Sequence, residues 1–245
     1  MKAVVLLSSG SHPVSRRAVL PTLEAQAIAL AKSLCDEVRG LHAGPDGEGV
    51  SDALGHGLNV VDCLTIEPDA DPLRALADHL SQSKPDLIVA GRRGQGGQDT
   101  GLLPYALADA LDLPILADVM AMTNTDDSSI IRLDQALAKG AKRRVTMRLP
   151  ALITVHPHSA PPLPFAFGRM RRGTIRHRAG LSVASLPSDF EVRPHRARPK
   201  LMRQASGSPG ENGGVIVNPD PEEAARIILE HLERIGVRSF KPKSP

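Results

Sequence analysis

The chain has 245 residues, 41% of them hydrophobic and 2% aromatic, so its core must be built from Leu, Val, Ile and Ala. The formal net charge is only +3, and a chain with one tyrosine and no tryptophan lacks the stacking side chains that nucleic-acid binding uses, which argues against that function. No apolar run approaches the roughly 20 residues that span a bilayer and no leader pattern opens the chain, so we expect a cytoplasmic protein without membrane insertion.

The first half of the chain alternates apolar runs with stretches of helical period. Thr22 is the predicted N-cap of the first helix, which carries apolar residues from Leu23 to Leu34. The expected strands cover 3–7, 38–43, 60–66, 87–90 and 115–122, and further helices cover 50–58, 72–80 and the residues after Thr100. This alternation predicts an α/β fold with a mostly parallel, doubly wound sheet and right-handed crossovers.

The pattern changes after residue 122. Three apolar runs, 130–133, 143–149 and 151–156, follow one another without a helix, and Lys139-Gly140 marks a hairpin turn. We therefore expect an antiparallel edge to the sheet, with the charges of 142–144 protecting that edge from aggregation.

The last third of the chain is irregular. Prolines at 161, 162 and 164 exclude a helix and predict an extended, exposed segment, and 187–214 has the composition of an arm or linker. A short strand at 214–217 and a final helix at 220–235 follow. We predict a nucleotide-binding α/β domain over 1–184 and, over 185–245, an extended arm with a terminal helix that docks on a partner subunit.

A glycine-rich loop follows the fourth predicted strand. Residues 84–114 read as strand, glycine-rich turn and helix, an order that presents backbone N–H groups and a helix N-terminus to an anion, usually a phosphate. The loop is not a P-loop, because no Gly-Lys-Ser/Thr follows it. From the residues alone, an ordinary long βα loop remains the alternative.

Nothing in the sequence assembles a catalytic or metal set. Cys35 and Cys63 have neither metal nor disulfide spacing and are expected to be buried thiols, and His156 and His158 lack a third ligand. No catalytic residue and no metal ligand is predicted. The aromatic side chains in the proline-rich segment stand beside arginines, which suits either an interface hot spot or ordinary loop packing.

These pieces together resemble the beta subunit of an electron-transfer flavoprotein. The resemblance covers most of the chain and is carried by PDLIVAGRRGQGGQDTG with DALDLP (85–114), LPALITV (149–155), AGPDGEGVSDALGHGLNVVDCLTIE (43–67) and PDPEEAARIILEHLERIGV (219–237). It implies a heterodimer in which an alpha subunit holds most of the contacts to the redox FAD, while the beta subunit holds AMP as a structural nucleotide. Electrons would pass from a flavin-dependent dehydrogenase or demethylase to a quinone-linked oxidoreductase of the respiratory chain, and the subunit would be no enzyme itself.

The resemblance also implies site residues. The cofactor-binding residues carried over are Leu6, Leu20, Pro21, Thr22, Leu23, Ala43, Gly91, Arg92, Gly96, Gly97, Gln98, Asp99, Thr100, Gly101, Leu102 and Leu103. The residues that would dock the partner dehydrogenase are Phe165, Phe167, Arg169 and Met170.

The chain departs from the family in that docking segment. Ala160-Pro161-Pro162 and Pro164 replace the usual Asn-Glu-Pro and Tyr, and we therefore expect a divergent member that serves a specialised dehydrogenase or demethylase. The alternative from another class is a stand-alone adenine-nucleotide-binding protein of regulatory or stress type, whose α/β unit and glycine loop would look alike. A nucleic-acid-binding role for the Arg-rich tail ranks third.

Overall fold

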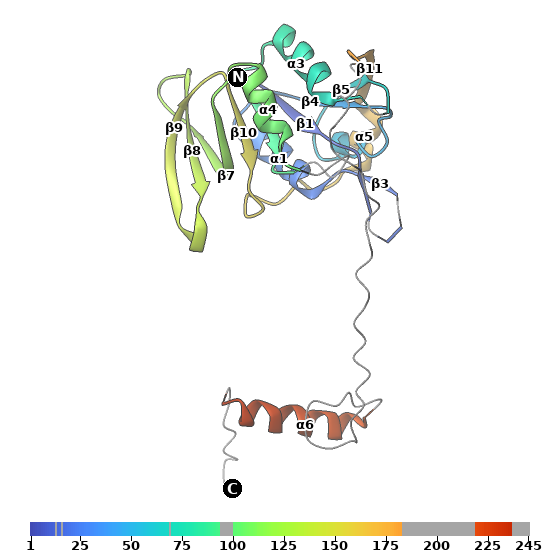
Figure 1. The fold of residues 1–245 in the computed structure, drawn as a ribbon, viewed down its shortest axis with the longest axis vertical. Helices are drawn as coiled ribbons and strands as arrows, with labels where there is room; N and C mark the ends of the chain where they lie inside the picture. The colour runs from blue at the N-terminus through green and yellow to red at the C-terminus, as the bar shows by residue number, and fades with distance from the viewer. Residues whose placement is uncertain (13, 16, 69, 94–99, 183–218, 237–245) are drawn as a thin grey trace, which may run out of the picture. The chain divides into compact units, whose positions relative to one another are not determined.

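The computed structural model describes residues 1–12, 14–15, 17–68, 70–93, 100–182 and 219–236. The chain divides into two compact units, residues 1–190 and 191–245. The first unit is built on a sheet whose strands are β1 (Lys2–Leu7), β4 (Glu37–Gly44), β5 (Val60–Thr65), β6 (Leu87–Gly91), β7 (Ile115–Asn124), β8 (Ile130–Ala136), β9 (Lys142–Arg148), β10 (Ala151–Val155) and β11 (Thr174–Ala179) (Figure 1). A separate two-stranded antiparallel sheet pairs β2 (Gly10–Ser11) with β3 (Ala18–Val19).

The nine strands lie in the order β11-β5-β4-β1-β6-β10-β7-β8-β9. All pairings from β11 to β7 are parallel, whereas β7, β8 and β9 pair antiparallel and form one end of the sheet. The mostly parallel sheet with an antiparallel edge is therefore confirmed. The charged strand 142–148 is the outermost strand at this end of the sheet, where the sequence placed it.

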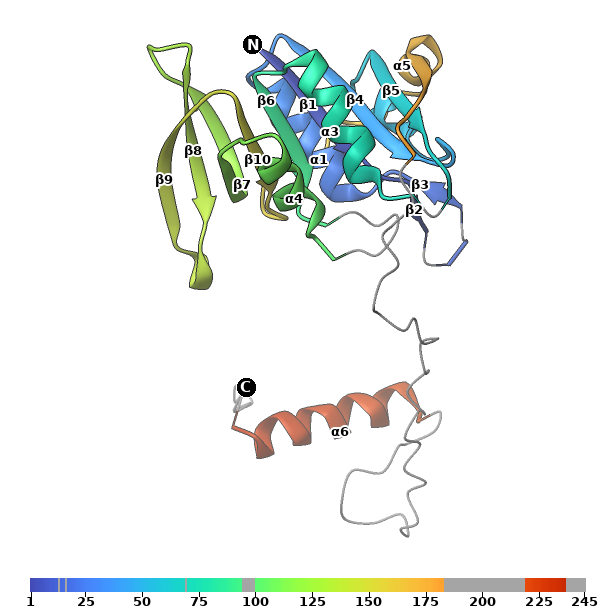
Figure 2. The ribbon, with the colours of Figure 1, turned by 45° about the horizontal axis from the view of Figure 1, so that its top comes forward.

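Helices cover both faces of this sheet. They are α1 (Thr22–Lys32), α2 (Asp52–Gly55), α3 (Pro72–Ser83), α4 (Leu103–Ala110) and α5 (Phe167–Arg172), and a short 3-10 turn, η1 (Ala138–Gly140), links β8 to β9. Figure 2 shows α3 and α4 together on one side of the parallel strands. Successive strand residues point to opposite faces, so Val5 packs with Ile28 of α1, while Val4 packs with Leu76 of α3 and Leu107 of α4. Two buried aliphatic layers result, as expected of parallel strands covered on both faces.

The start of α1 differs from the sequence prediction. Pro21, not Thr22, occupies the N-cap position, and no side chain caps the helix there. The Pro21 carbonyl accepts the N–H groups of Glu24 and Ala25, at 3.0 and 3.1 Å. A proline suits this position because it has no N–H of its own to leave unpaired. The second helix is also shorter than the predicted 50–58, since α2 has four residues.

The segment that was predicted to be irregular after His158 contains two elements. Residues 167–172 form α5, and 174–179 form β11, which pairs with β5 over all six of its residues. The prediction failed because β11 is an edge strand with only Ile175 half-buried, so its sequence lacks an apolar run. Arg178 also reaches Asp62, a buried residue of β5, at 3.8 Å, a long-range contact that no local pattern reveals.

The second unit contains α6 (Pro221–Arg234), close to the predicted bounds. The Asp220 side chain accepts the N–H of Glu222 at 3.2 Å, and Glu222 and Glu223 lie in the first turn, where the helix dipole favours acidic residues. Its apolar residues Ile228 and Leu229 are exposed. The predicted arm at 187–214 and strand at 214–217 lie outside the described residues.

Two further predictions concern composition. Cys35 and Cys63 are both free and buried, as expected. Within the described ranges, no helix has the length and apolarity required to traverse a bilayer.

Candidate functional site

The sheet has a topological switch point between β1 and β6. The chain passes from β1 to β4 on one side, and β6 lies on the other side of β1, so the loops after β1 and β6 diverge. In open α/β sheets, ligands bind in the crevice formed where such loops part at the carboxyl ends of the strands. Val5 pairs in register with Val89, which brings Ser8 and the Gly91-Arg92 turn to this edge.

Glu24 lies between the two loops, although it belongs to neither. Its carboxylate accepts the Ser8 N–H at 2.7 Å and also accepts the Ser8 hydroxyl. A Cβ added to Gly91 would lie 3.4 Å from Glu24 Cγ and 3.6 Å from Leu23 Cβ, so the start of α1 packs closely on the end of β6. Glu24 is only 3% exposed, and this burial raises the pKa of its carboxyl group to about 8, against the opposing effect of the Ser8 hydrogen bonds.

His42 fixes the third loop of this edge, the one that follows β4. Its ring nitrogens lie 2.9 Å from the Leu7 carbonyl oxygen and 2.8 Å from the Asp46 carbonyl oxygen. The Ser9 hydroxyl donates to the Glu48 carbonyl oxygen and so ties the loop after β1 to the same turn. The loops after β1 and β4 are therefore held together by side-chain hydrogen bonds, and not only by the sheet.

The glycine-rich loop is described at both of its ends. Gly91 and Arg92 begin it, and Thr100 to Leu103 lead into α4. Gly101 has φ +73°, a left-handed conformation that favours glycine, and a Cβ added to it would lie 3.0 Å from the Arg92 carbonyl oxygen. The Thr100 hydroxyl accepts the Leu102 N–H at 3.2 Å. The predicted binding residues Gly96, Gly97, Gln98 and Asp99 lie outside the described residues.

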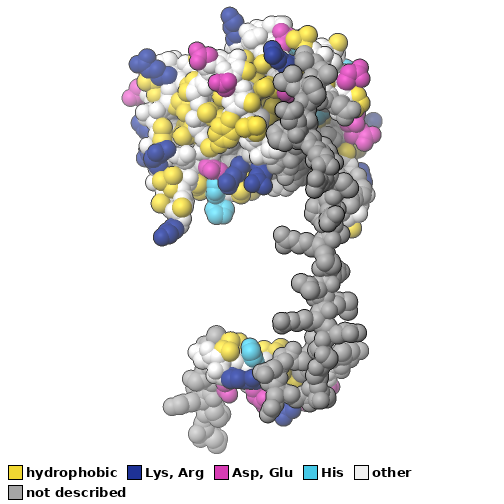
Figure 3. All heavy atoms as spheres, in the orientation of Figure 1, with side chains coloured by type: hydrophobic (Ala, Val, Ile, Leu, Met, Phe, Trp, Pro, Cys, Tyr) yellow, Lys and Arg dark blue, Asp and Glu magenta, His cyan; other side chains and the backbone are white. Residues whose placement is uncertain are grey.

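A charged pair lies beside this loop. Arg92 Nη1 is 3.6 Å from Asp118 Oδ1, and the Asp118 N–H donates to the Thr154 hydroxyl at 3.1 Å. Arg92 is half-exposed, and Arg93 and His158 are exposed nearby in the chain segments that leave β6 and β10. Figure 3 shows Lys or Arg and His side chains side by side at the lower margin of the main unit. Arg92 and Arg93 therefore offer positive charge to an anionic ligand at this end of the sheet.

The structure distributes the predicted adenosine-lining residues over two faces. Leu20 packs in the buried layer between the sheet and α1, here called the α1 layer, and Pro21 is buried beside it. Leu6 and Ala43 belong to the α3 layer. Of the predicted set, Leu23 and Gly91 are brought into contact at the switch point. Ser8 lies in the loop that the sequence places at the ligand-binding end of the first strand, whereas Glu24 and His42 were not predicted. Glu24 carries little signal in the sequence, because Gln26 is a second polar residue in the same helix.

The predicted docking residues differ in how much they pack against the rest of the first unit. Phe165 is 48% exposed, and the rest of its ring packs on Gly55, with its centroid 5.5 Å from that of His56. His56 Nδ1 lies 2.8 Å from the Leu163 carbonyl oxygen, and the Ala166 N–H donates to the Gly55 carbonyl oxygen at 3.0 Å. The half-buried Met170 packs against the α1 layer. Phe167, 59% exposed, and Arg169 are left facing outward.

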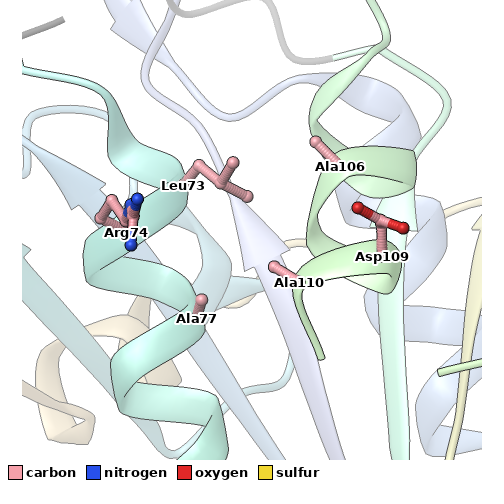
Figure 4. A pocket seen from close by; sticks show the side chains of 6 residues that line it. All are labelled: Leu73, Arg74, Ala77, Ala106, Asp109 and Ala110. Atoms are coloured by element: carbon pink, nitrogen blue, oxygen red, sulfur yellow. The ribbon is translucent and has the colours of Figure 1, made fainter. Parts of the chain in front are cut away.

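A surface pocket of about 450 Å³ lies elsewhere, between α3 and α4. Figure 4 shows Leu73, Arg74 and Ala77 of α3 opposite Ala106, Asp109 and Ala110 of α4. Its walls are mostly alanine and leucine side chains, and its lining residues include no glycine turn that would present backbone N–H groups. The loops at the switch point between β1 and β6 are therefore the better candidate for binding a nucleotide.

Comparison with known proteins identifies a family. The family described as electron transfer flavoprotein domain matches residues 14–179. The electron transfer flavoprotein subunit beta of Chromohalobacter salexigens is 34% identical over 251 residues, and the alignment covers 95% of this chain and 94% of that protein. Together the two matches favour a carrier subunit over a stand-alone nucleotide-binding protein.

Proposed function

This chain belongs to the electron transfer flavoprotein family as a beta subunit, and from that membership we propose that it forms a heterodimer with an electron transfer flavoprotein alpha subunit. The heterodimer accepts electrons from a flavin-dependent dehydrogenase or demethylase and delivers them to a quinone-linked oxidoreductase of the respiratory chain. The redox FAD is held mainly by the alpha subunit. This chain makes no bond itself, and its two buried free thiols suit a reducing cytoplasm.

The nucleotide of this subunit is AMP, bound at the switch point between β1 and β6. The observation that carries this proposal is the glycine turn at Gly101, with φ +73°, which lies at the entry to α4 and close to the Arg92 carbonyl oxygen at the carboxyl end of β6. The Leu102 N–H of this turn donates to the Thr100 hydroxyl, so the other backbone N–H groups of the turn and the Arg92 guanidinium would supply the positive charge that a phosphate requires. The AMP has a structural role, because a ligand that binds only the folded state stabilises it by mass action.

Two exposed features serve the protein partners. Phe167 and Arg169 contact the electron donor, because an exposed aromatic ring beside an arginine has the composition of an interface hot spot. The arm from 185 and α6 dock on the alpha subunit. The exposed Ile228, Leu229 and Ile235 support this, since an amphipathic helix with no buried residue needs a partner surface.

Co-expression with the alpha subunit tests this function. We expect a yellow heterodimer from which denaturation releases FAD and AMP in equal amounts, measured by absorbance and mass spectrometry. A heterodimer that contains FAD without any adenine mononucleotide would contradict AMP binding. Titration with reduced dehydrogenases and demethylases should then identify a donor that reduces the flavin, and failure of every such donor would contradict the proposed electron source.

A further inference from the structure

Glu24 is a buried acid at the site proposed for AMP, and neither the family comparison nor the proposed function gives it a role. It is 3% exposed, and both of its carboxylate oxygens face Ser8, the first residue after β1. Its Cγ packs against Gly91, the last residue of β6. One side chain of α1 therefore joins the two strand ends that form the crevice.

We propose that the Glu24 carboxyl group positions Ser8 and Gly91 for the nucleotide and takes up a proton when the phosphate binds. This inference rests on the proposed AMP site. The proton comes from solvent and bonds to a carboxylate oxygen of Glu24, so a carboxylate becomes a neutral carboxylic acid. The neutral acid has an O–H that donates to the Ser8 hydroxyl oxygen, and the Ser8 hydroxyl proton is then free to face the crevice.

The surroundings of Glu24 favour this behaviour. Burial raises the pKa of Glu24 to about 8, and the Ser8 hydroxyl and N–H act in the opposite direction. Charged or titratable side chains on the neighbouring elements are Arg92 and Arg93 after β6, His156 after β10 and His42 on β4. Among these described residues none offsets the burial of Glu24: Arg92 lies against Asp118, and His42 lies between two carbonyl oxygens.

An anion beside this carboxyl group disfavours its ionised form, since like charges repel strongly where water is excluded. A bound phosphate therefore shifts Glu24 further toward the neutral acid, and by linkage the affinity for the phosphate falls as pH rises above 8. The AMP phosphate itself loses its second proton near pH 6, about two units lower. Between pH 7.5 and 9.5, Glu24 is thus the group whose protonation changes.

The test is calorimetric titration of AMP into the nucleotide-depleted heterodimer between pH 7.5 and 9.5, in two buffers of different ionisation enthalpy. For the wild-type heterodimer we expect net proton uptake and an affinity that falls by up to about tenfold per pH unit above pH 8. Glu24→Gln should remove both the uptake and the slope, because an amide does not titrate. Adenosine, which has no phosphate, should bind the wild-type protein without proton uptake.

Ser8→Ala gives a second, independent readout. It removes the hydroxyl that lowers the pKa of Glu24 and keeps the N–H, so the fall in affinity should begin at a higher pH. The inference would be overturned if the AMP affinity of the wild type did not depend on pH, or if Glu24→Gln kept the same slope of AMP affinity against pH. Neither result would contradict the proposed AMP site. If Glu24→Gln does not assemble, an unchanged onset in Ser8→Ala overturns it. A wild-type heterodimer that binds no AMP at any pH overturns the AMP site as well.

Discussion

The Phe165 ring lies on the backbone of Gly55, so close that a Cβ added to Gly55 would be 2.2 Å from Phe165 Cε2. The two residues are far apart in the sequence, and the hydrogen bond from Ala166 to the Gly55 carbonyl oxygen holds them in this arrangement. A ring seated on a glycine of α2 fixes the path of the proline-rich segment that leads into α5. The exposed Phe167 is therefore presented from a fixed loop, which lowers the ordering cost of docking.

Gly55→Ala is expected to displace Phe165 and loosen the docking loop. A Cβ 2.2 Å from a ring carbon cannot be accommodated, so the Phe165 ring must move away from residue 55. We expect the KM for the electron donor to rise severalfold in assays of the heterodimer, while the flavin content stays unchanged. Gly47→Ala is the matched control, because its nearest contact would be an ordinary 3.4 Å to Cys63 Sγ. Equal KM values for the two variants would contradict the proposed role of Gly55.

Phe167→Ala and Phe165→Ala should have different effects on the free energy of unfolding. Phe167 is 59% exposed and has no predicted role in the core, so its truncation should weaken donor docking by about 1–2 kcal/mol, roughly tenfold in KM, and leave the free energy of unfolding unchanged. Phe165→Ala should lower the free energy of unfolding as well, because it empties the space over Gly55. Donor kinetics and urea unfolding measured on both variants make the comparison. Loss of stability in Phe167→Ala would show that it packs within the fold.

The buried Glu24 should make the protein less stable as pH rises. Its pKa is about 8 in the folded state and 4.5 without burial, so its contribution to stability is full below pH 4.5, falls between pH 4.5 and 8, and is lost above pH 8. The free energy of unfolding should fall by about 1.4 kcal/mol per pH unit within that window. The difference between wild type and Glu24→Gln in urea unfolding from pH 5 to 9 isolates this effect, and a constant difference would contradict it.

Gly101→Ala should weaken the retention of AMP. The φ of +73° at Gly101 costs an L-residue about 1–2 kcal/mol, and the added Cβ would lie 3.0 Å from the Arg92 carbonyl oxygen. We expect the AMP content of the purified heterodimer to drop, as measured by chromatography after denaturation. Gly236→Ala introduces the same backbone strain at φ +75°, where a Cβ would meet nothing within 4 Å, and should keep its AMP. An equal loss of AMP in both variants would contradict the proposed role of the Gly101 turn in AMP binding.

The alternation of parallel strands and helices could be predicted from local sequence. An apolar run as short as 87–90 fits a buried strand and is too short for a helix. The apolar residues of α3 and α6 recur with a clear helical period, so all of these elements can be predicted from the local order of apolar residues. The charged edge at β9 and the acidic first turn of α6 are local features too. The family followed from motifs whose spacing is visible in the chain, and the comparisons confirmed it.

Features that depend on contacts between distant residues became visible only in the folded chain. The strand β11 has an exposed, arginine-rich sequence and exists because β5 offers it a full register of hydrogen bonds. Glu24 reads as one polar residue in a helix until the fold places it against Ser8 and Gly91. Phe165 and Phe167 look alike in the sequence, and both are substantially exposed at 48% and 59%, but only the Phe165 ring rests on Gly55. Periodicity records which face of an element is buried, but it does not record what covers that face.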